Sequence, residues 1–317
     1  MKEILRILPA SAMGYIQSIP RTEHENIEEI RLRVGRQIEI VMNGRPYPRI
    51  QENQDASFSQ KDAQSFIHKL SEYSLYALEE ELRRGFITIS GGHRVGLSGH
   101  VVTRGGQVKL IRDISSFNIR IAKQKIGAAL PLVPYLFEGG HWYNTLIIGS
   151  PQTGKTTLLR DLSRLISSGI PEQSILSKKV GIVDERSEIA GSLRGVPQNE
   201  LGQRVDVLDA CPKAEGMMML IRSMSPDVLV VDEIGRKEDS DALQEAMNAG
   251  VAVMATVHSA GYQQLFKRPT ISPLLETGVF ERYVELSNRA GQGHNGRINR
   301  ILDGQGKVVH RTGKMTS

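Results

Sequence analysis

The fold is decided by the stretch Gly149-Ser150-Pro151-Gln152-Thr153-Gly154-Lys155-Thr156. It matches the pattern G-x-x-x-x-G-K-[ST], in which backbone N–H groups surround phosphates, the lysine reaches the terminal phosphates and the hydroxyl binds Mg²⁺. An apolar strand at 145–148 precedes the stretch and a helix follows it, so the N-terminus of this helix points at the bound anion. The stretch, extended by Thr157, therefore predicts a site for ATP and Mg²⁺.

A second signal for this chemistry is the acidic pair that ends the apolar run 228–231. Asp232 and Glu233 follow four apolar residues that we expect to form a buried strand. Ligands bind at the carboxyl ends of strands in open α/β sheets, so Asp232 is expected to hold Mg²⁺ through water or through Thr156. ATP hydrolysis also requires a group that activates or orients the attacking water. Glu233 is the leading candidate for that role.

Two further strand ends are expected to reach the same edge of the sheet. Glu185 follows another apolar run and is a candidate to share the hydrolytic role with Glu233. Thr256 ends a fourth run and His258 follows it; either is a candidate to sense the terminal phosphate by hydrogen bonding. An ordinary hydrogen-bonded loop residue is the alternative in each case.

The arrangement of apolar runs from residue 126 onward is typical of an α/β domain. Four runs are apolar on both faces, as expected for strands of a parallel sheet that helices cover on each side. They are 145–148, 180–183, 228–231 and 251–256. Three later segments, 282–287, 297–302 and 307–310, predict an antiparallel hairpin at the edge of the sheet. Residues 126–317 are therefore assigned to one P-loop domain of the α/β class.

Residues 1–125 have a different pattern, which predicts a smaller α+β domain. Helical spacing of apolar residues occurs at 1–16, 59–70 and 75–84. Strands are expected at 30–34, 38–42, 86–90, 94–102, 107–111 and 117–121. Asn43-Gly44 suits a hairpin turn because both positions tolerate φ > 0. The predicted order is thus a small α+β domain followed by the phosphate-binding domain.

The composition is that of an ordinary globular protein and excludes several classes. The chain has 317 residues, enough for two domains, with 39% hydrophobic and 24% charged residues. Its net charge of +5 is spread over the sequence and is weak support for nucleic-acid binding. The single cysteine, Cys211, excludes an internal disulfide framework and fits a reducing compartment. No apolar run approaches the ~18 residues of a membrane span. We therefore expect a cytoplasmic protein.

The motifs together resemble those of the type II and type IV secretion ATPases, which are hexameric RecA-like enzymes. Lys155 and Thr156 match the Walker A lysine and hydroxyl of these enzymes. Glu233 matches their catalytic Walker B glutamate, and His258 matches the His-box histidine. The resemblance implies a RecA-like fold for the second domain, assembly into a homo-hexamer and ATP hydrolysis.

One position departs from the secretion ATPases. They usually have Gly-Glu where this chain has Asp232-Glu233, which makes the expected Mg²⁺ role of Asp232 more conventional in this chain. Either Glu185 or the preceding Asp184 falls in their Asp box. The resemblance therefore leaves the division of roles between Glu185 and Glu233 open.

A closer resemblance is to the stage III sporulation protein AA family. It is carried by the stretches 29–36, 85–99, 149–156 and 183–190, and it extends over nearly the whole chain. Such proteins are implied to act in the mother cell of endospore-forming bacteria, as the peripheral ATPase of a channel complex at the outer forespore membrane. Their implied partner is the membrane protein AB of the same operon, which is similar to secretion-system platform proteins.

A phosphate site of this class is usually completed by an arginine from a neighbouring domain or subunit. Arg112 and Arg120 lie just before the P-loop domain, in a segment similar to the one that provides such arginines in secretion ATPases. They are the leading candidates for this role.

Two other functions stay open at the level of sequence. The first is a RecA-like nucleic-acid motor, because Arg31, Arg33 and Arg36 form a basic cluster. Aromatic residues make up only 5% of the chain, however, and none forms an obvious stacking platform with these arginines, which makes nucleic acid the less favoured partner. The second is a switch in which ATP orders an assembly surface and turnover is incidental.

Overall fold

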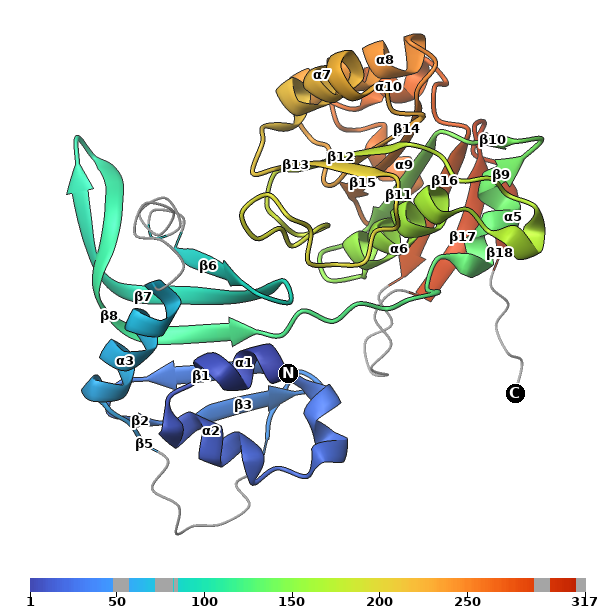
Figure 1. Cartoon of the computed structure of the whole chain (residues 1–317). Helices are drawn as coiled ribbons and strands as arrows, with labels where there is room; N and C mark the ends of the chain where they lie inside the picture. The colour runs from blue at the N-terminus through green and yellow to red at the C-terminus, as the bar shows by residue number, and fades with distance from the viewer. Residues whose placement is uncertain (48–56, 72–81, 83–84, 288–296, 312–317) are drawn as a thin grey trace. The chain divides into compact units, whose positions relative to one another are not determined.

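The structure is a computed structural model of the chain, and it describes residues 1–47, 57–71, 82, 85–287 and 297–311. The chain divides into two compact units, Met1–Lys123 and Gln124–Ser317. Each unit has its own sheet and its own hydrophobic core (Figure 1). Among the described residues, no helix has both the length and the apolar character that a membrane crossing requires.

The N-terminal unit is built on a six-stranded antiparallel sheet with the order β4-β3-β1-β8-β7-β6. Its strands are β1 (Ile27–Arg33), β3 (Glu39–Met42), β4 (Arg45–Pro46), β6 (Phe86–Ile89), β7 (His93–Arg104) and β8 (Gln107–Arg120). A separate two-stranded ribbon pairs β2 (Arg36–Gln37) with β5 (Ser57–Phe58). Alternation of apolar and polar residues along β1 buries Ile30 and Leu32 and leaves the intervening Arg31 partly exposed.

Three helices supply the other half of the N-terminal core. They are α1 (Lys2–Ile7), α2 (Ala10–Gln17) and α3 (Gln60–Ser71), and a 3₁₀ turn, η1 (Arg21–Asn26), leads from α2 into β1. The predicted helix over residues 1–16 is wrong in one respect, because it is broken into α1 and α2. Pro9 lacks a backbone N–H and forces the preceding residue out of the helical region, and Leu8 is accordingly extended with φ −62° and ψ 145°.

Two turns in the N-terminal unit show where backbone geometry sets the residue type. Asn43 and Gly44 have φ of 51° and 71° and join paired residues of β3 and β4, which confirms the predicted hairpin. The strands predicted at 107–111 and 117–121 are one strand, β8, interrupted by an irregular pairing where Asp113 has φ 49°. Gly99 faces this point, and a Cβ there would lie 2.7 Å from a carbonyl oxygen of Arg112. The helix predicted at 75–84 lies outside the described residues except for Leu82.

The C-terminal unit is built on an eight-stranded sheet with the order β13-β12-β14-β15-β11-β16-β17-β18. The first six strands in this order, from β13 to β16, are parallel. Strands β17 and β18 follow β16 in antiparallel pairing and form with it the edge hairpin that the sequence predicts. The strands are β11 (Thr145–Gly149), β12 (Val180–Asp184), β13 (Val205–Asp209), β14 (Val228–Val231), β15 (Ala252–His258), β16 (Arg282–Ser287), β17 (Arg297–Asp303) and β18 (Val308–Arg311). Strand β13 is an addition to the predicted set.

Helices cover both faces of this sheet (Figure 1). On one face, α6 (Lys155–Ser168) buries Leu158, Leu159 and Leu162 against apolar residues of the strands. On the other, α7 (Lys213–Met224), α8 (Lys237–Asn248) and α10 (Ser272–Glu276) bury a second set. The smaller elements are η2 (Leu130–Leu132), α5 (Val133–Leu136), β9 (Phe137–Glu138), β10 (His141–Trp142), η3 (Pro171–Gln173) and α9 (Tyr262–Leu265). The predicted combination of a smaller sheet domain and a helix-covered parallel sheet is confirmed.

The strand order decides which loops meet. Parallel pairing puts the carboxyl ends of β12, β14, β15 and β11 at one edge of the sheet, in that order. Strand β15 thus lies between β11, which leads into the glycine-rich loop, and β14, which leads into Asp232-Glu233. Side chains at the end of β15 can therefore contact both.

Candidate functional site

The loop between β11 and α6 has the backbone of a phosphate cradle. Gln152 and Gly154 take the left-handed conformation, with φ of 63° and 86°. A Cβ on Gly149 would lie 2.4 Å from Oγ1 of Thr153, so glycine is required there. Helix α6 begins after Gly154 without a side-chain cap. Because the first N–H groups of a helix have no partner inside the helix, these donors suit an anion.

Lys155 is a buried cation whose described contacts are neutral. Its side chain is 4% exposed, and its Nζ donates to the carbonyl of Ser150 at 2.9 Å and to Nδ1 of His258 at 2.9 Å. Burial lowers the pKa of Lys155, and the nearby charges of Asp232 and Glu233 act in the opposite direction. A buried ammonium group is favoured by an anionic partner. The cradle and this lysine therefore fit the phosphates of a nucleotide.

Asp232 is held between two threonine hydroxyls. Thr156 donates to Oδ2 of Asp232 at 2.6 Å, and Thr256 donates to Oδ1. Carboxylate and hydroxyl oxygens are the ligands that Mg²⁺ prefers, and this ion usually takes its other ligands from substrate phosphates and water. No group of three or more acidic, histidine or cysteine side chains suited to a metal occurs in the described part of the chain. Thr156 and Asp232 thus fit a magnesium ion that is held jointly with a nucleotide.

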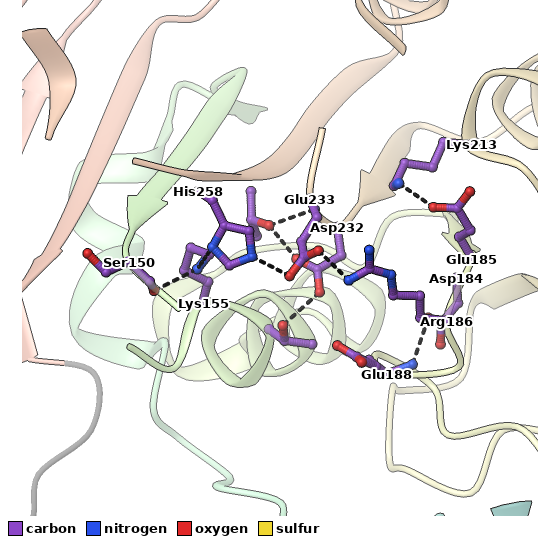
Figure 2. A network of polar contacts seen from close by, with 12 residues as sticks. Ser150, Lys155, Asp184, Glu185, Arg186, Glu188, Lys213, Asp232, Glu233 and His258 are labelled. Carbon is purple, nitrogen blue, oxygen red and sulfur yellow. Dashed lines mark hydrogen bonds and ion pairs between the residues drawn. The ribbon is translucent and has the colours of Figure 1, made fainter. Parts of the chain in front are cut away.

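Glu233 contacts two cationic or proton-donating side chains (Figure 2). Its Oε1 lies 2.5 Å from Nε2 of His258, and its Oε2 accepts a hydrogen bond from Arg186 at 2.7 Å. The ammonium of Lys155 can only donate, so Nδ1 of His258 accepts and the ring proton lies on Nε2, facing Glu233. His258 therefore connects the phosphate loop to the Glu233 carboxylate through one imidazole ring.

Asp184 and Glu185, at the end of β12, have different surroundings. Asp184 is 2% exposed, and its carboxylate accepts the backbone N–H groups of Glu188, Ile189 and Ala190 at 2.8, 3.0 and 2.8 Å. Burial raises its pKa to about 6, although these hydrogen bonds act to lower it. Glu185 is ion-paired with Lys213 and turned toward it in Figure 2. The structure thus brings Lys155, Asp232, Glu233 and His258 together and gives Glu185 another partner.

One partly buried cation beside the site was not predicted from the sequence. Arg160 of α6 donates to the carbonyls of Ile189 and Glu188 at 2.7 and 2.5 Å, and it fastens the segment after β12 to the helix after the phosphate loop. Burial lowers its pKa. Its position four residues after Thr156 places it on the same side of the helix, and this spacing is the signal that could have identified it.

The segment that enters the C-terminal unit is also fixed to α6. Asp161, which is 1% exposed, accepts the N–H groups of Gly127 and Ala129 at 3.1 and 2.8 Å. Three residues earlier, Gln124 makes two hydrogen bonds with the backbone of Glu200, at 2.6 and 2.9 Å. The first residues of this unit are therefore held by the helix of the phosphate loop and by the segment after β12.

Arg112 and Arg120, the predicted completing arginines, belong to β8 of the N-terminal unit. Their side chains are 61% and 64% exposed. Arg112 lies 3.4 Å from Asp113, and Arg120 lies 3.6 Å from Glu29. Such exposed pairs contribute little to stability, so both guanidinium groups are accessible to another partner.

The fold and the site define a P-loop protein of the secretion-ATPase structural class. The DotB ATPase of Yersinia pseudotuberculosis superposes with a TM-score of 0.61 at 14% identity, covering 93% of this chain and 80% of DotB. The pilus retraction motor PilT, solved with ADP bound, gives 0.58 at 16% identity, covering 89% of this chain and 77% of PilT. At such low identity the likeness establishes the fold.

The sequence then places the chain within one family. The family model for sporulation stage III, protein AA, matches residues 1–309, and the chain belongs to this family. It is 53% identical over 312 residues to stage III sporulation protein AA of Bacillus subtilis strain 168, with 98% of each chain covered. The resemblance to the sporulation family is thus confirmed, and the resemblance to the secretion ATPases is confirmed for the fold.

Proposed function

We propose that this protein hydrolyses ATP and thereby powers or assembles a membrane channel complex during endospore formation. The observation that carries the proposal is the chain of contacts from Lys155 through His258 to Glu233, next to Asp232 and Thr156. These contacts join Lys155, the buried cation of the phosphate cradle, to the carboxylate of Glu233. Glu233 lies next to the two residues that fit a magnesium ion, Asp232 and Thr156. Membership of a sporulation family and a fold shared with a pilus retraction motor support the wider role.

Each residue of the site has a proposed task. The loop 149–157 and Lys155 hold the phosphates, and Thr156 and Asp232 hold Mg²⁺. Bound Mg²⁺ supplies positive charge that offsets the charge of the phosphates. Glu233 orients a water molecule and accepts its proton. His258 couples the position of the Glu233 carboxylate to the contact that Lys155 makes, because its ring bonds both side chains. Glu185 has the lesser part, because its carboxylate pairs with Lys213.

The proposed assembly is a ring of six copies. An arginine of a neighbouring copy, Arg112 or Arg120, would stabilise the charge that develops on the terminal phosphate. The ring would lie in the mother cell, at the outer forespore membrane, through a membrane protein of the stage III sporulation protein AB type. Nucleic acid is not a proposed partner.

The experiment measures two properties of the full chain with and without Mg-ATP. They are the steady-state rate of phosphate release and the particle size in solution. We expect the wild type to hydrolyse ATP and to enlarge with nucleotide. Lys155→Ala removes the buried cation, so the rate should fall by about 100-fold or more. Lys237→Ala, at an exposed position of α8, is the matched control and should behave as wild type. Arg112→Ala and Arg120→Ala separate the two arginines in the same assay.

The outcomes separate the alternatives. Equal rates for wild type and Lys155→Ala, with a monomer under every condition, would contradict the proposal. Nucleotide-dependent enlargement without turnover would favour the assembly switch. Stimulation by single-stranded nucleic acid with a steep salt dependence would favour the nucleic-acid motor.

A further inference from the structure

Asp232 and Glu233 are neighbours in the chain and yet both face the site. In a regular strand, consecutive side chains point to opposite faces of the sheet. Glu233 avoids this because its backbone is left-handed, with φ 52°. This conformation is unfavourable for a residue with a Cβ atom and persists only where the surroundings hold it. Something in the structure must therefore hold the backbone of Glu233.

Thr256 of β15 provides that restraint. It is 0% exposed, and its Oγ1 accepts the backbone N–H of Glu233 at 2.8 Å. Its backbone carbonyl accepts the N–H of the next residue, Ile234, at 2.9 Å. The backbone N–H groups of Glu233 and Ile234 are thus both held by Thr256 of the neighbouring strand.

The same hydroxyl also orients Asp232. A hydroxyl has one proton to donate, and because Oγ1 of Thr256 receives the Glu233 N–H, that proton goes to Oδ1 of Asp232. The other carboxylate oxygen, Oδ2, is then directed at Thr156, 2.6 Å away. The single proton of the Thr256 hydroxyl is donated to Asp232 and is therefore not available to a phosphate oxygen in this arrangement, which favours His258 as the candidate phosphate sensor.

We infer that Thr256 is a positioning residue that fixes Asp232 toward Thr156 and Glu233 toward His258. Its hydroxyl contacts the Asp232 carboxylate and the backbone of Glu233, and Thr256 acts through these two residues. The inference rests on the proposed function only where it concerns hydrolysis. The effect of Thr256 on the backbone of Glu233 exists without any ligand.

The test compares Thr256→Val, which has the same shape and no hydroxyl, with Thr256→Ser, which keeps the hydroxyl. The first measurement is amide hydrogen exchange, resolved by NMR on the full chain without nucleotide. In Thr256→Val the Glu233 amide loses its acceptor, and its exchange should speed up by about tenfold or more. The Ile234 amide, bonded to the Thr256 backbone, should change little and is the internal control. Thr256→Ser should resemble wild type at both amides.

The second measurement is the split between kcat and KM for ATP. Thr256→Val should lower kcat by about 10- to 100-fold and change KM by less than about threefold, because the phosphate cradle is intact. Thr256→Ser should restore most of the rate. Fluorescence of the single tryptophan, Trp142, shows whether the valine variant folds. If it does not, both measurements are made on Thr256→Ala instead.

The two ideas fail in different ways. A wild type without turnover would contradict the proposed function, and amide exchange would still decide the role of Thr256. A Glu233 amide that exchanges equally slowly in wild type and Thr256→Val would overturn the inference, whatever the rate of hydrolysis. Equal kcat values for the valine and serine variants of an active enzyme would also overturn it.

Discussion

The dipeptide Asp-Glu occurs at the ends of two neighbouring parallel strands, β12 and β14, and has a different structure at each. Asp184-Glu185 and Asp232-Glu233 both follow apolar residues and reach the same edge of the sheet. Asp184 accepts three backbone N–H groups, whereas Asp232 accepts two threonine hydroxyls. The role of an acidic strand end is therefore decided by what surrounds it.

The path of the chain after each strand explains the difference. After β12 the backbone folds back through Ser187, which has φ 53°, and offers the amides of the next three residues to Asp184. After β14 the chain leaves toward α8, so Asp232 is left to side chains of α6 and β15. One carboxylate organises a loop, and the other faces the phosphate cradle.

The sharpest test of this comparison exchanges each glutamate for glutamine. Glu233→Gln cannot accept a proton, and the hydrolysis rate should fall by about 10²- to 10⁴-fold. Glu185→Gln should stay within about threefold of wild type, because its carboxylate pairs with Lys213 and not with His258. Phosphate release at saturating ATP measures both, and the affinity for a fluorescent ATP analogue serves as the binding control. Equal losses in the two variants would mean that the glutamates share the role.

Replacing Asp184 or Asp232 with alanine tests the comparison through the free energy of unfolding. Asp184→Ala leaves three backbone N–H groups without their acceptor, two of them buried, and should cost about 3 to 5 kcal/mol of unfolding free energy. Asp232→Ala leaves two hydroxyls that can rotate to other acceptors, and about 1 kcal/mol is expected. Urea unfolding followed by Trp142 reports on this unit, because the only tryptophan lies in the core of the C-terminal unit and is 2% exposed. Similar losses at both positions would show that the loop does not depend on Asp184.

A smaller effect is expected from the titration of Asp184. Its pKa rises from the ordinary 3.8 to about 6 because of burial. Between these values the folded protein keeps a proton that the unfolded chain has released, so stability falls as the pH rises from about 4 to about 6. A shift of this size corresponds to about 2 to 3 kcal/mol.

The measurement is the unfolding free energy of wild type relative to Asp184→Asn, which does not titrate, across this pH range. Wild type should lose stability relative to the variant up to about pH 6 and run parallel above about pH 7. A difference that does not change with pH would contradict the raised pKa.

Much of the fold follows from short-range patterns. The runs of apolar residues predict β11, β12, β14 and β15, because strands that are buried on both faces carry no polar alternation. The edge hairpin is predicted separately, from the segments 282–287, 297–302 and 307–310. Strand β13 was missed because Val205-Asp-Val-Leu-Asp209 contains two acids and, at the edge of the sheet, is only partly buried. The break between α1 and α2 is encoded by Pro9 and needed no tertiary information.

The site was predictable as a set of strand ends but not as a set of contacts. Parallel topology explains why Thr156 and Asp232 meet, since both lie at the same edge of the sheet. The contact of His258 with Glu233 depends on the left-handed backbone of Glu233, which no local pattern indicates. The burial of Asp184 depends on amides of a loop whose path the sequence does not reveal.

The central place of β15 also limits how its length can change in evolution. Thr256 and His258 are two residues apart and so project to the same side of the strand. Deletion or insertion of a single residue earlier in β15 would turn both side chains to the opposite side at once. The same change would misalign the hydrogen bonds with β14 and β11 together. We therefore expect relatives to vary in the loops on either side of β15, and β15 itself to keep a constant length.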